Sequence, residues 1–258
     1  MPCLMTNKAY ILSIEEGLDA LMEYHVVFVG EEHGSRVAHE AESIILTGLA
    51  ERDPSLVLAL EMFERDVQDI LDGYLKGEMS EDEFLERSRP WPDYQEDYRP
   101  LVEFAKSKGL PVIAANIPRR AAASVSMSND ISPRVLGSDV LYLPEKLYSD
   151  SEEYRERFMA TLGKMSSMGP MKRLKPEALY KAQVLKDAVM ADSLESFLDR
   201  RILFCCGHFH SDYHLGIPYQ LGKNHPELRI AVITMASVVE PLAMKDRSRV
   251  ADFIWIDE

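Results

Sequence analysis

Two short apolar runs, each followed by glycine and then by histidine, place the strongest constraint on the fold of this 258-residue chain. Residues 26–29 precede Gly-Glu-Glu-His at 30–33, and residues 202–206 precede Gly-His-Phe-His at 207–210. Short uninterrupted apolar runs are typical of strands that are buried on both faces, as in a parallel sheet. Both runs therefore predict central parallel strands with polar residues at their carboxyl ends.

Further apolar runs alternate with amphipathic helical patterns along the chain. The runs at 56–60, 111–115 and 229–234 predict strands, and 252–256 predicts an edge strand. The apolar spacing predicts helices at 13–22, 35–52, 98–108, 154–162, 176–198 and 213–223. This alternation predicts an α/β fold, with a mostly parallel β-sheet flanked by helices on both faces.

The middle of the chain departs from this alternation. Residues 124–138 are rich in Ser, Asn, Gly and Pro, which favours a loop or the edge of an insertion. We therefore expect a single α/β domain over 1–258, with a smaller helical subdomain inserted at roughly 120–180 that covers the sheet edge.

Composition limits the classes of partner and the compartment. The net charge of −14 disfavours nucleic acid and anionic lipid as main partners. No apolar run approaches the ~20 residues that span a bilayer, so we expect no membrane insertion. The first eight residues lack the apolar core of a signal peptide, and no lipobox precedes Cys3. Cys205 and Cys206 are adjacent in a predicted strand and point to opposite faces, which argues against a disulfide framework. We expect a soluble, cytoplasmic protein with a small-molecule ligand or substrate.

Polar residues follow the predicted strands at four places. Because the carboxyl ends of parallel strands meet at one edge of a sheet, these residues are expected to form one site. Strand alternation would place Glu31 and His33 on one side and Glu32 on the other, and His208 and His210 on a shared side. The residues concerned are Glu31, Glu32, His33, Glu61, Asn116, Arg119, His208 and His210.

Two chemistries suit this set of residues. Two histidines with one or two carboxylates are a ligand set for Zn²⁺, Mn²⁺ or Fe²⁺, which makes Glu31, His33, Glu61, His208 and His210 candidate metal ligands. Without a metal, His33 would act as a general base, Glu31 or Glu61 as its carboxylate partner and Arg119 as an electrostatic stabiliser. His210 completes the candidate catalytic set.

Simpler structural roles suit other residues near the strand ends. Glu32 and Glu64 are expected to be N-cap or first-turn residues of a helix, and His39 is expected to be structural. Neither Ser35 nor Ser211 lies in a nucleophile-elbow pattern, which disfavours a serine hydrolase. No Gly-x-Gly-x-x-Gly motif or P-loop occurs, which disfavours nucleotide binding.

Six motifs in a fixed order carry a resemblance to a known family. They are Val-Gly-Glu-Glu-His (29–33), Leu-Glu-Met-Phe (60–63), Tyr-Arg-Pro-Leu-Val-Glu-Phe-Ala (98–105), Ala-Asn-Ile-Pro-Arg (115–119), Cys-Gly-His-Phe-His (206–210) and Leu-Gly-Ile-Pro (215–218). In this order they resemble the ChaN family of haem-binding proteins, which is grouped with the Tiki proteases and the erythromycin esterases. The resemblance covers about 25 to 235 and implies a parallel sheet with a smaller helical domain.

The resemblance also implies functional residues. In the wider group, paired Gly-x-x-His motifs and a glutamate mark a hydrolytic site, and these match Glu31, His33, Glu61 and His210 here. ChaN itself looks like a membrane-anchored lipoprotein that holds haem through tyrosine at a dimer interface. The resemblance of this chain to that family therefore implies a haem cofactor and a homodimer. Candidate haem-contacting residues are Arg99, Asn116 and Tyr213, with Tyr148, Tyr154 and Tyr219 as further possible axial ligands.

Two functions from different classes follow. The first is binding of haem, iron or another metal at the carboxyl edge of the sheet. The alternative is a hydrolase, either metal-dependent or dependent on histidine and glutamate, that acts on an ester, amide or peptide.

Overall fold

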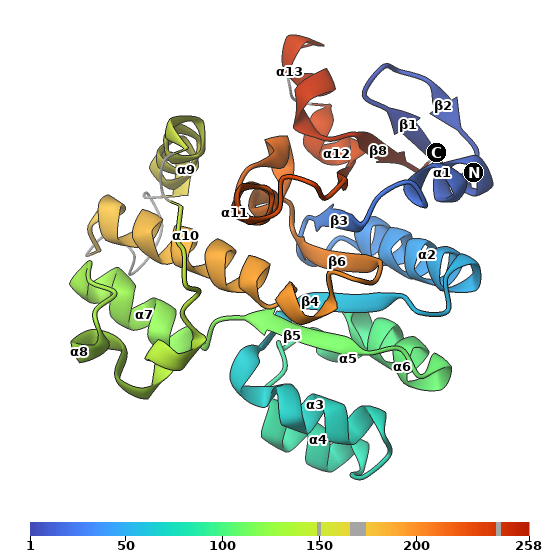
Figure 1. Ribbon diagram of the computed structural model, residues 1–258. Coiled ribbons are helices and arrows are strands. Elements are labelled where there is room, and N and C mark those ends of the chain that lie inside the picture. The colour runs from blue at the N-terminus through green and yellow to red at the C-terminus, as the bar shows by residue number, and fades with distance from the viewer. Residues whose placement is uncertain (149–150, 166–173, 241–243, 258) are drawn as a thin grey trace.

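A computed structural model describes residues 1–148, 151–165, 174–240 and 244–257, and within them the strands form one sheet (Figure 1). This eight-stranded sheet has the order β2-β1-β8-β7-β3-β6-β4-β5. Its strands are β1 Cys3–Thr6, β2 Ile11–Leu12, β3 Val26–Glu31, β4 Val57–Glu64, β5 Val112–Asn116, β6 Ile202–Gly207, β7 Ile230–Met235 and β8 Phe253–Ile256.

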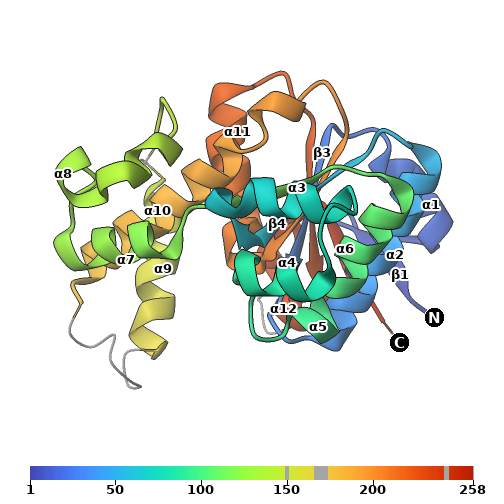
Figure 2. The same cartoon turned by 90° about the horizontal axis from the view of Figure 1, so that it is seen from below.

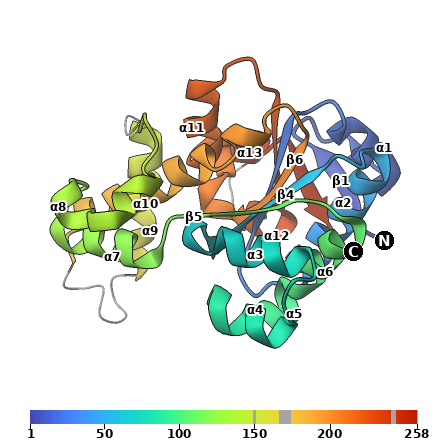
Figure 3. The same cartoon turned by 60° about the horizontal axis from the view of Figure 1, so that its bottom comes forward.

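The central strands are parallel, as the sequence predicts. Strand β3 pairs in parallel with β6 and β7, and β4 pairs in parallel with β6 and β5. The strand at the carboxyl end of the chain is not at an edge, which corrects the expectation for 252–256. Strand β8 lies between β7 and the antiparallel β1, which in turn pairs with β2. Strands β1 and β2 were not predicted because both are short and β2 is largely exposed. Their pairing with β8 brings the two chain ends close together (Figure 3).

Helices cover both faces of the sheet, which confirms the predicted fold class. Alternate residues of β3 pack into two separate apolar cores. Val27 and Val29 belong to the core that contains residues of α1, α2 and α6, whereas Val26 and Phe28 belong to the core that contains residues of α10 and α11. The helices are α1 Ile14–Leu21, α2 Arg36–Arg52, α3 Gln68–Leu75, α4 Glu81–Ser88, α5 Tyr94–Asp97, α6 Arg99–Lys108, α7 Arg119–Ser128, α8 Pro133–Leu136, α9 Glu152–Met165, α10 Pro176–Asp192, α11 Ile217–Asn224, α12 Ala236–Val239 and α13 Met244–Val250.

Helices α7, α8 and α9 gather beyond β5 with the first part of α10 (Figure 2). Helices α7, α8 and α10 share an apolar core, in which Val125 of α7 and Leu136 of α8 pack with Leu185 and Val189 of α10. Helix α9 packs on α10 in a separate cluster that contains Tyr154 and Val184. The last turns of α10 belong instead to the core on the sheet, through Met190 and Ala191. Helix α10 therefore connects the helical group to the sheet. Residues 166–173 of the expected insertion lie outside the described residues.

The loop expected at 124–138 is wrong for most of its length, because α7 continues to Ser128, α8 spans Pro133–Leu136 and a 3₁₀ turn begins at Gly137. The serines of α7 do not break that helix, since Ser124 Oγ donates to the Arg120 carbonyl and Ser128 Oγ donates to the Ser124 carbonyl. Asn129 then ends the helix in the left-handed conformation, at φ 59°.

Two other helix boundaries also differ from the prediction. Helix α10 ends at Asp192, so the predicted helix at 176–198 is too long. Helix α11 begins at Ile217, after Gly216 with φ 59°, so the helix predicted from 213 starts too early. Among the helices in the described ranges, none is both long and apolar enough to cross a membrane.

Candidate functional site

A cavity of about 650 Å³ opens where β3 and β6 end at the carboxyl edge of the sheet. Its polar lining includes Glu31, His33 and His210. Its apolar walls come from the 3₁₀ turn His208–His210 and from α9 and α10, through Phe158, Leu162, Leu179 and Phe209. This volume lies within the range of ligand pockets, about 300–1,000 Å³. The position agrees with the general rule that open α/β sheets bind ligands beyond the carboxyl ends of their strands.

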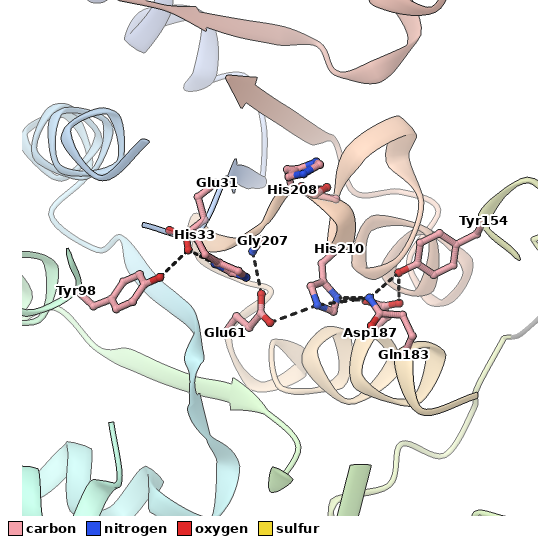
Figure 4. A network of polar contacts seen from close by, with 11 residues as sticks. Glu31, His33, Glu61, Tyr98, Tyr154, Gln183, Asp187, Gly207, His208 and His210 are labelled. Carbon is pink, nitrogen blue, oxygen red and sulfur yellow. Dashed lines mark hydrogen bonds and ion pairs between the residues drawn. The ribbon is translucent and has the colours of Figure 1, made fainter. Parts of the chain in front are cut away.

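Strand alternation sends the two glutamates of the site to opposite faces of the sheet. Glu31 continues the series of Val27 and Val29, so its side chain lies on the α2 side. Glu61 continues the series of Val57 and Ala59, so its side chain lies on the α10 side. Strand β4 is longer than predicted and includes Glu61, because a register shift after Leu60 extends it to Glu64. The site therefore has two acid–histidine networks, one from each face, that meet at Gly207 (Figure 4).

The first network joins Glu31 and His33. Glu31 Oε1 lies 2.5 Å from His33 Nδ1 and accepts a hydrogen bond of 2.7 Å from the Tyr98 hydroxyl. Burial opposes ionisation of Glu31, but the hydrogen bonds of His33, His39 and Tyr98 outweigh it and hold the pKa of Glu31 well below its ordinary value. The hydrogen bond to Glu31 raises the pKa of His33 against the effect of burial. The Glu31 side chain is fully buried, whereas 45% of the His33 side chain is exposed. A buried anion thus holds an accessible imidazole at the cavity.

Gly207 provides the space in which the His33 ring lies. A Cβ atom at this position would be 2.8 Å from His33 Nε2 and 2.9 Å from Cε1. The Gly207 N–H also donates a 2.8 Å hydrogen bond to Glu61 Oε2. Glycine at this position therefore lets the His33 ring and the Glu61 carboxylate approach the same peptide unit.

A Gly207→Ala substitution is expected to displace the His33 ring from this position while leaving the sheet intact. The added methyl group would overlap the ring, which has an exposed side into which it can move. We expect any activity that depends on His33 to fall by at least about tenfold, since small misplacements of a reacting group are costly. The far-ultraviolet circular dichroism spectrum should match that of the wild-type protein. Unchanged activity would show that the ring position over Gly207 is unimportant.

The second network is a buried series of polar contacts that runs from Glu61 to Tyr154. His210 Nε2 lies 3.3 Å from Glu61 Oε1, and His210 Nδ1 lies 2.5 Å from Asp187 Oδ1. The Tyr154 hydroxyl donates a 2.7 Å hydrogen bond to Asp187 Oδ2, and Gln183 Nε2 lies 3.2 Å from His210 Nδ1. Both ring nitrogens of His210 therefore face carboxylates, which is the arrangement expected of an imidazolium ion.

Burial and the charges of neighbouring side chains together set the pKa values of His210, Glu61 and Asp187 in this network. Burial would lower the pKa of His210, but the charges of Glu61 and Asp187 raise it to about 10. Burial likewise opposes the ionisation of Glu61, yet the charge of His210 lowers the Glu61 pKa to about 2. The pKa of Asp187 is raised because burial outweighs the effect of His210. The two carboxylates therefore favour the protonated form of His210 beneath the cavity.

The structure brings together Glu31, His33, Glu61 and His210, as expected from the strand ends, but by a different local geometry. Strand β3 ends at Glu31 and β6 ends at Gly207, so extended alternation does not continue to the histidines. The next residues turn, in β6 through the 3₁₀ turn His208–His210. His208 lines the cavity and forms a separate pair, with Nδ1 2.7 Å from Asp212 Oδ2.

Arg119 and Asn116 lie near the same edge. Arg119 lines the cavity, and its Nε donates a 2.7 Å hydrogen bond to Glu64 Oε1. Glu64 is the last residue of β4 and, as expected, occupies the N-cap position of the next helical turn, the 3₁₀ turn Arg65–Val67. Its side chain does not cap that turn, because its carboxylate accepts from Arg119 and Arg89 instead. Glu32, expected in the same role, precedes the N-cap Ser35 of α2 and lines the cavity instead. Asn116 is buried at the end of β5, and its Oδ1 has no hydrogen-bond partner.

Two residues suggested by the resemblance lie away from this cavity. Arg99 begins α6 and forms an ion pair of 2.5 Å with Glu81 of α4. The ring of Tyr213 lies under the guanidinium of Arg157, 3.2 Å from the ring centroid, and lines a different cavity. Tyr148 is hydrogen-bonded to Asn224, 3.0 Å away.

Several residues of the two networks were missed by sequence reasoning or assigned a passive role. Asp187 and Gln183 of α10, and His39 and Glu42 of α2, are polar residues within otherwise apolar helix faces. Glu42 and Asp187 are fully buried. A charged residue inside an apolar stripe is the signal that could have found them, because burial of a charge requires a partner.

Comparison with known proteins places the chain in a family. The family described as haem-binding uptake, Tiki superfamily, ChaN matches residues 17–221. The chain belongs to this family. The ChaN family assignment agrees with the six sequence motifs and with the observed sheet.

Solved structures share the fold of this ChaN-family chain. The structure titled cofacial heme binding to ChaN of Campylobacter jejuni superposes on this chain with a TM-score of 0.78 at 19% identity. The alignment covers 100% of this chain and 97% of the other. An H289N mutant of the erythromycin esterase EreC in its open conformation gives a TM-score of 0.52 at 15% identity, with 90% of this chain and 76% of that chain covered. At these identities the likeness establishes the fold alone.

A curated relative is the chloroplastic protein RETICULATA-RELATED 5 of Arabidopsis thaliana, which is 23% identical over 258 aligned positions. The alignment covers 92% of this chain and 34% of the relative. The chain therefore spans about a third of the length of the curated relative that it matches.

Proposed function

We propose that the cavity at the carboxyl edge hydrolyses an ester, amide or peptide bond of a small molecule, with His33 as the general base. The observation that carries this proposal is the contact of 2.5 Å between buried Glu31 and partly exposed His33. A carboxylate on Nδ1 favours the tautomer that carries its proton there, which leaves Nε2 able to accept a proton. Glu31 also stabilises the imidazolium ion that forms when His33 accepts that proton.

The reaction requires water, a base and a positive charge near the carbonyl oxygen. His33 Nε2 accepts a proton as the water oxygen bonds to the carbonyl carbon, and the electron pair of the C=O bond moves to oxygen. Arg119 and Lys186 line the cavity and supply positive charge for this oxyanion. The intermediate then expels the alcohol or amine, to which His33 returns the proton. Buried His210 lies beneath the site and holds Glu61 in place.

The test is a screen of ester, amide and peptide substrates with purified protein, in which the His33→Gln variant serves as the blank. Saturable turnover that disappears in this variant would support the proposal. If wild-type and variant rates were equal for every substrate, the proposed general base would be wrong. Repeating the screen with a chelator would separate metal-dependent hydrolysis from hydrolysis by histidine and glutamate alone.

Haem binding is the second candidate, and two observations favour it. The first is membership of a family described as haem-binding. The second is the donor set of the cavity, where the imidazole of His33 adjoins apolar walls that include Phe158, Leu179 and Phe209. Imidazole is an established axial ligand of haem iron, and Arg119 and Lys186 suit its propionates. Bound haem would supply an iron centre there. Among the described residues no tyrosine lines this cavity, so His33 is the preferred ligand.

A haemin titration followed by absorption spectroscopy tests this candidate. If haem binds in the cavity, we expect a saturable spectral shift at one equivalent per chain, which His33→Gln alters and Tyr213→Phe leaves unchanged. A shift lost only in Tyr213→Phe would place haem elsewhere. Uptake that never saturates, or that detergent abolishes, would contradict specific haem binding.

A further inference from the structure

A second cluster of titratable side chains lies on the α2 side of the sheet, behind Glu31. His39 and Glu42 lie on the same face of α2, one turn apart, and approach the end of β3. Glu31 and Glu42 are fully buried, and His39 is 7% exposed. One ligand atom from each of the three residues lies within 4.8 Å of the others. We refer to Glu31, His39 and Glu42 as the buried triad.

The spacing of the buried triad suits a tetrahedral metal ion. His39 Nδ1 lies 3.3 Å from Glu31 Oε2 and 3.1 Å from Glu42 Oε2. Zinc binds nitrogen and carboxylate oxygen at about 2.0–2.2 Å, so neighbouring ligand atoms of a tetrahedral site are about 3.3 Å apart. The three side chains therefore stand close to the separation that a shared ion requires.

Unpartnered buried oxygens are the independent observation that points to a ligand. Glu31 Oε2 and Glu42 Oε1 are both buried, and neither has a partner in good hydrogen-bonding geometry; the nearest contact of Glu31 Oε2 is the 3.3 Å ion pair with His39 Nδ1. A buried carboxylate oxygen without a partner is costly, and two such oxygens beside one histidine are unusual in a folded core. A cation between them would satisfy both oxygens at once.

We propose that the buried triad binds a divalent metal ion of the zinc class. The site differs from the carboxyl-edge cavity, because it uses Glu31 Oε2, whereas His33 and Tyr98 contact Glu31 Oε1. The proposal does not depend on the proposed hydrolysis. Glu31 is the residue shared by the two sites, so the ion would hold the carboxylate that orients His33.

The surroundings of the buried triad match the outer shell of known metal sites. Asp97 Oδ2 lies 3.3 Å from His39 Nε2, the ring nitrogen that does not face the triad. Metal-binding histidines commonly place a carboxylate on the second ring nitrogen in this way. Tyr98 likewise donates a hydrogen bond of 2.7 Å to the other oxygen of Glu31.

A surface cavity beside α2 reaches one member of the buried triad. His39 lines it together with Gly34, Asp97 and Pro100. Solvent therefore comes as close to the buried triad as the His39 ring.

The experiment is a calorimetric titration of chelator-treated protein with Zn²⁺ and with Mn²⁺, followed by measurement of the metal that remains bound after desalting. We expect one ion per chain and a rise in melting temperature with metal. Loss of a metal ligand should weaken binding more than the 10–100-fold seen when outer-shell residues are lost, so Glu42→Gln should weaken it by more than about 100-fold. Glu40→Gln is the matched control, because Glu40 lies on the same helix but is exposed and pairs with Arg36.

Two further variants keep the result interpretable. Should Glu42→Gln fold poorly by circular dichroism, His39→Gln removes the imidazole ligand instead. A His33→Gln variant reports on a metal at the carboxyl edge. Metal binding that survives Glu42→Gln but is lost in His33→Gln would overturn the assignment to the buried triad. The absence of stoichiometric binding to the wild-type protein would overturn it as well.

Discussion

A His33→Gln substitution is expected to reduce hydrolysis by about 10²–10⁴-fold, the range that general acid–base catalysis contributes. Glutamine keeps a hydrogen-bonding group near Glu31 but cannot accept a proton from water at neutral pH. The loss should appear mainly in kcat, because the side chain acts on the reacting water rather than on the bound substrate. The measurement is steady-state kinetics on the best substrate from the screen.

Stability measurements separate a catalytic role of His33 from a structural one. Nearly half of its side chain is exposed, so His33→Gln should change the free energy of unfolding by less than about 1 kcal/mol. His225→Gln is a suitable control, because His225 lies outside the cavity and pairs with Glu195. Equal activity losses in both variants, or a loss of activity explained by unfolding, would contradict the proposed role of His33.

An Asp187→Asn substitution is expected to destabilise the fold by about 3 kcal/mol at pH 6 to 7, because it removes one partner of a buried ion pair. Asp187 is fully buried and accepts from both His210 and Tyr154. Asparagine preserves the shape but leaves His210 with Glu61 as its single carboxylate partner. The measurement is denaturant unfolding, with the free energy extrapolated to water.

The destabilisation by Asp187→Asn should depend on pH. The pKa of His210 is raised from 6.5 to about 10, so the stability from its charged form is fully present below about pH 6.5 and is lost as pH rises through about 10. The difference between wild type and variant should therefore be largest near pH 6 and shrink toward pH 10. Asp192→Asn on the same helix is the control, because its partly exposed pair with Arg65 should be worth less than about 1 kcal/mol. A difference that grows with pH would contradict a charged His210.

Much of the sheet could be predicted from the sequence because its central strands are buried on both faces. Apolar runs at 26–29 and 202–206, each followed by glycine, favour such strands, and parallel strands bring their carboxyl ends to one edge. Strands β1 and β2 were not predicted, since strands of four and two residues are too short to show a comparable pattern. The serines of α7 led to the opposite error, since a loop was predicted where the helix continues. Their hydroxyl groups donate hydrogen bonds to carbonyl groups of the same helix.

The sequence by itself placed Glu31, His33, Glu61 and His210 at one edge of a sheet, because each follows or ends an apolar run that predicts a parallel strand. The order of those strands, in which β6 lies between β3 and β4, comes from the structure. The sequence did not determine which groups these side chains contact. Their partners His39, Glu42 and Asp187 come from helices, and only the packing of α2 and α10 on opposite faces brings them to the strand ends. Tertiary structure therefore decided that His33 stays accessible while His210 is buried as a cation. Ionisation depends on burial and on the nearest charges, which strand periodicity does not encode.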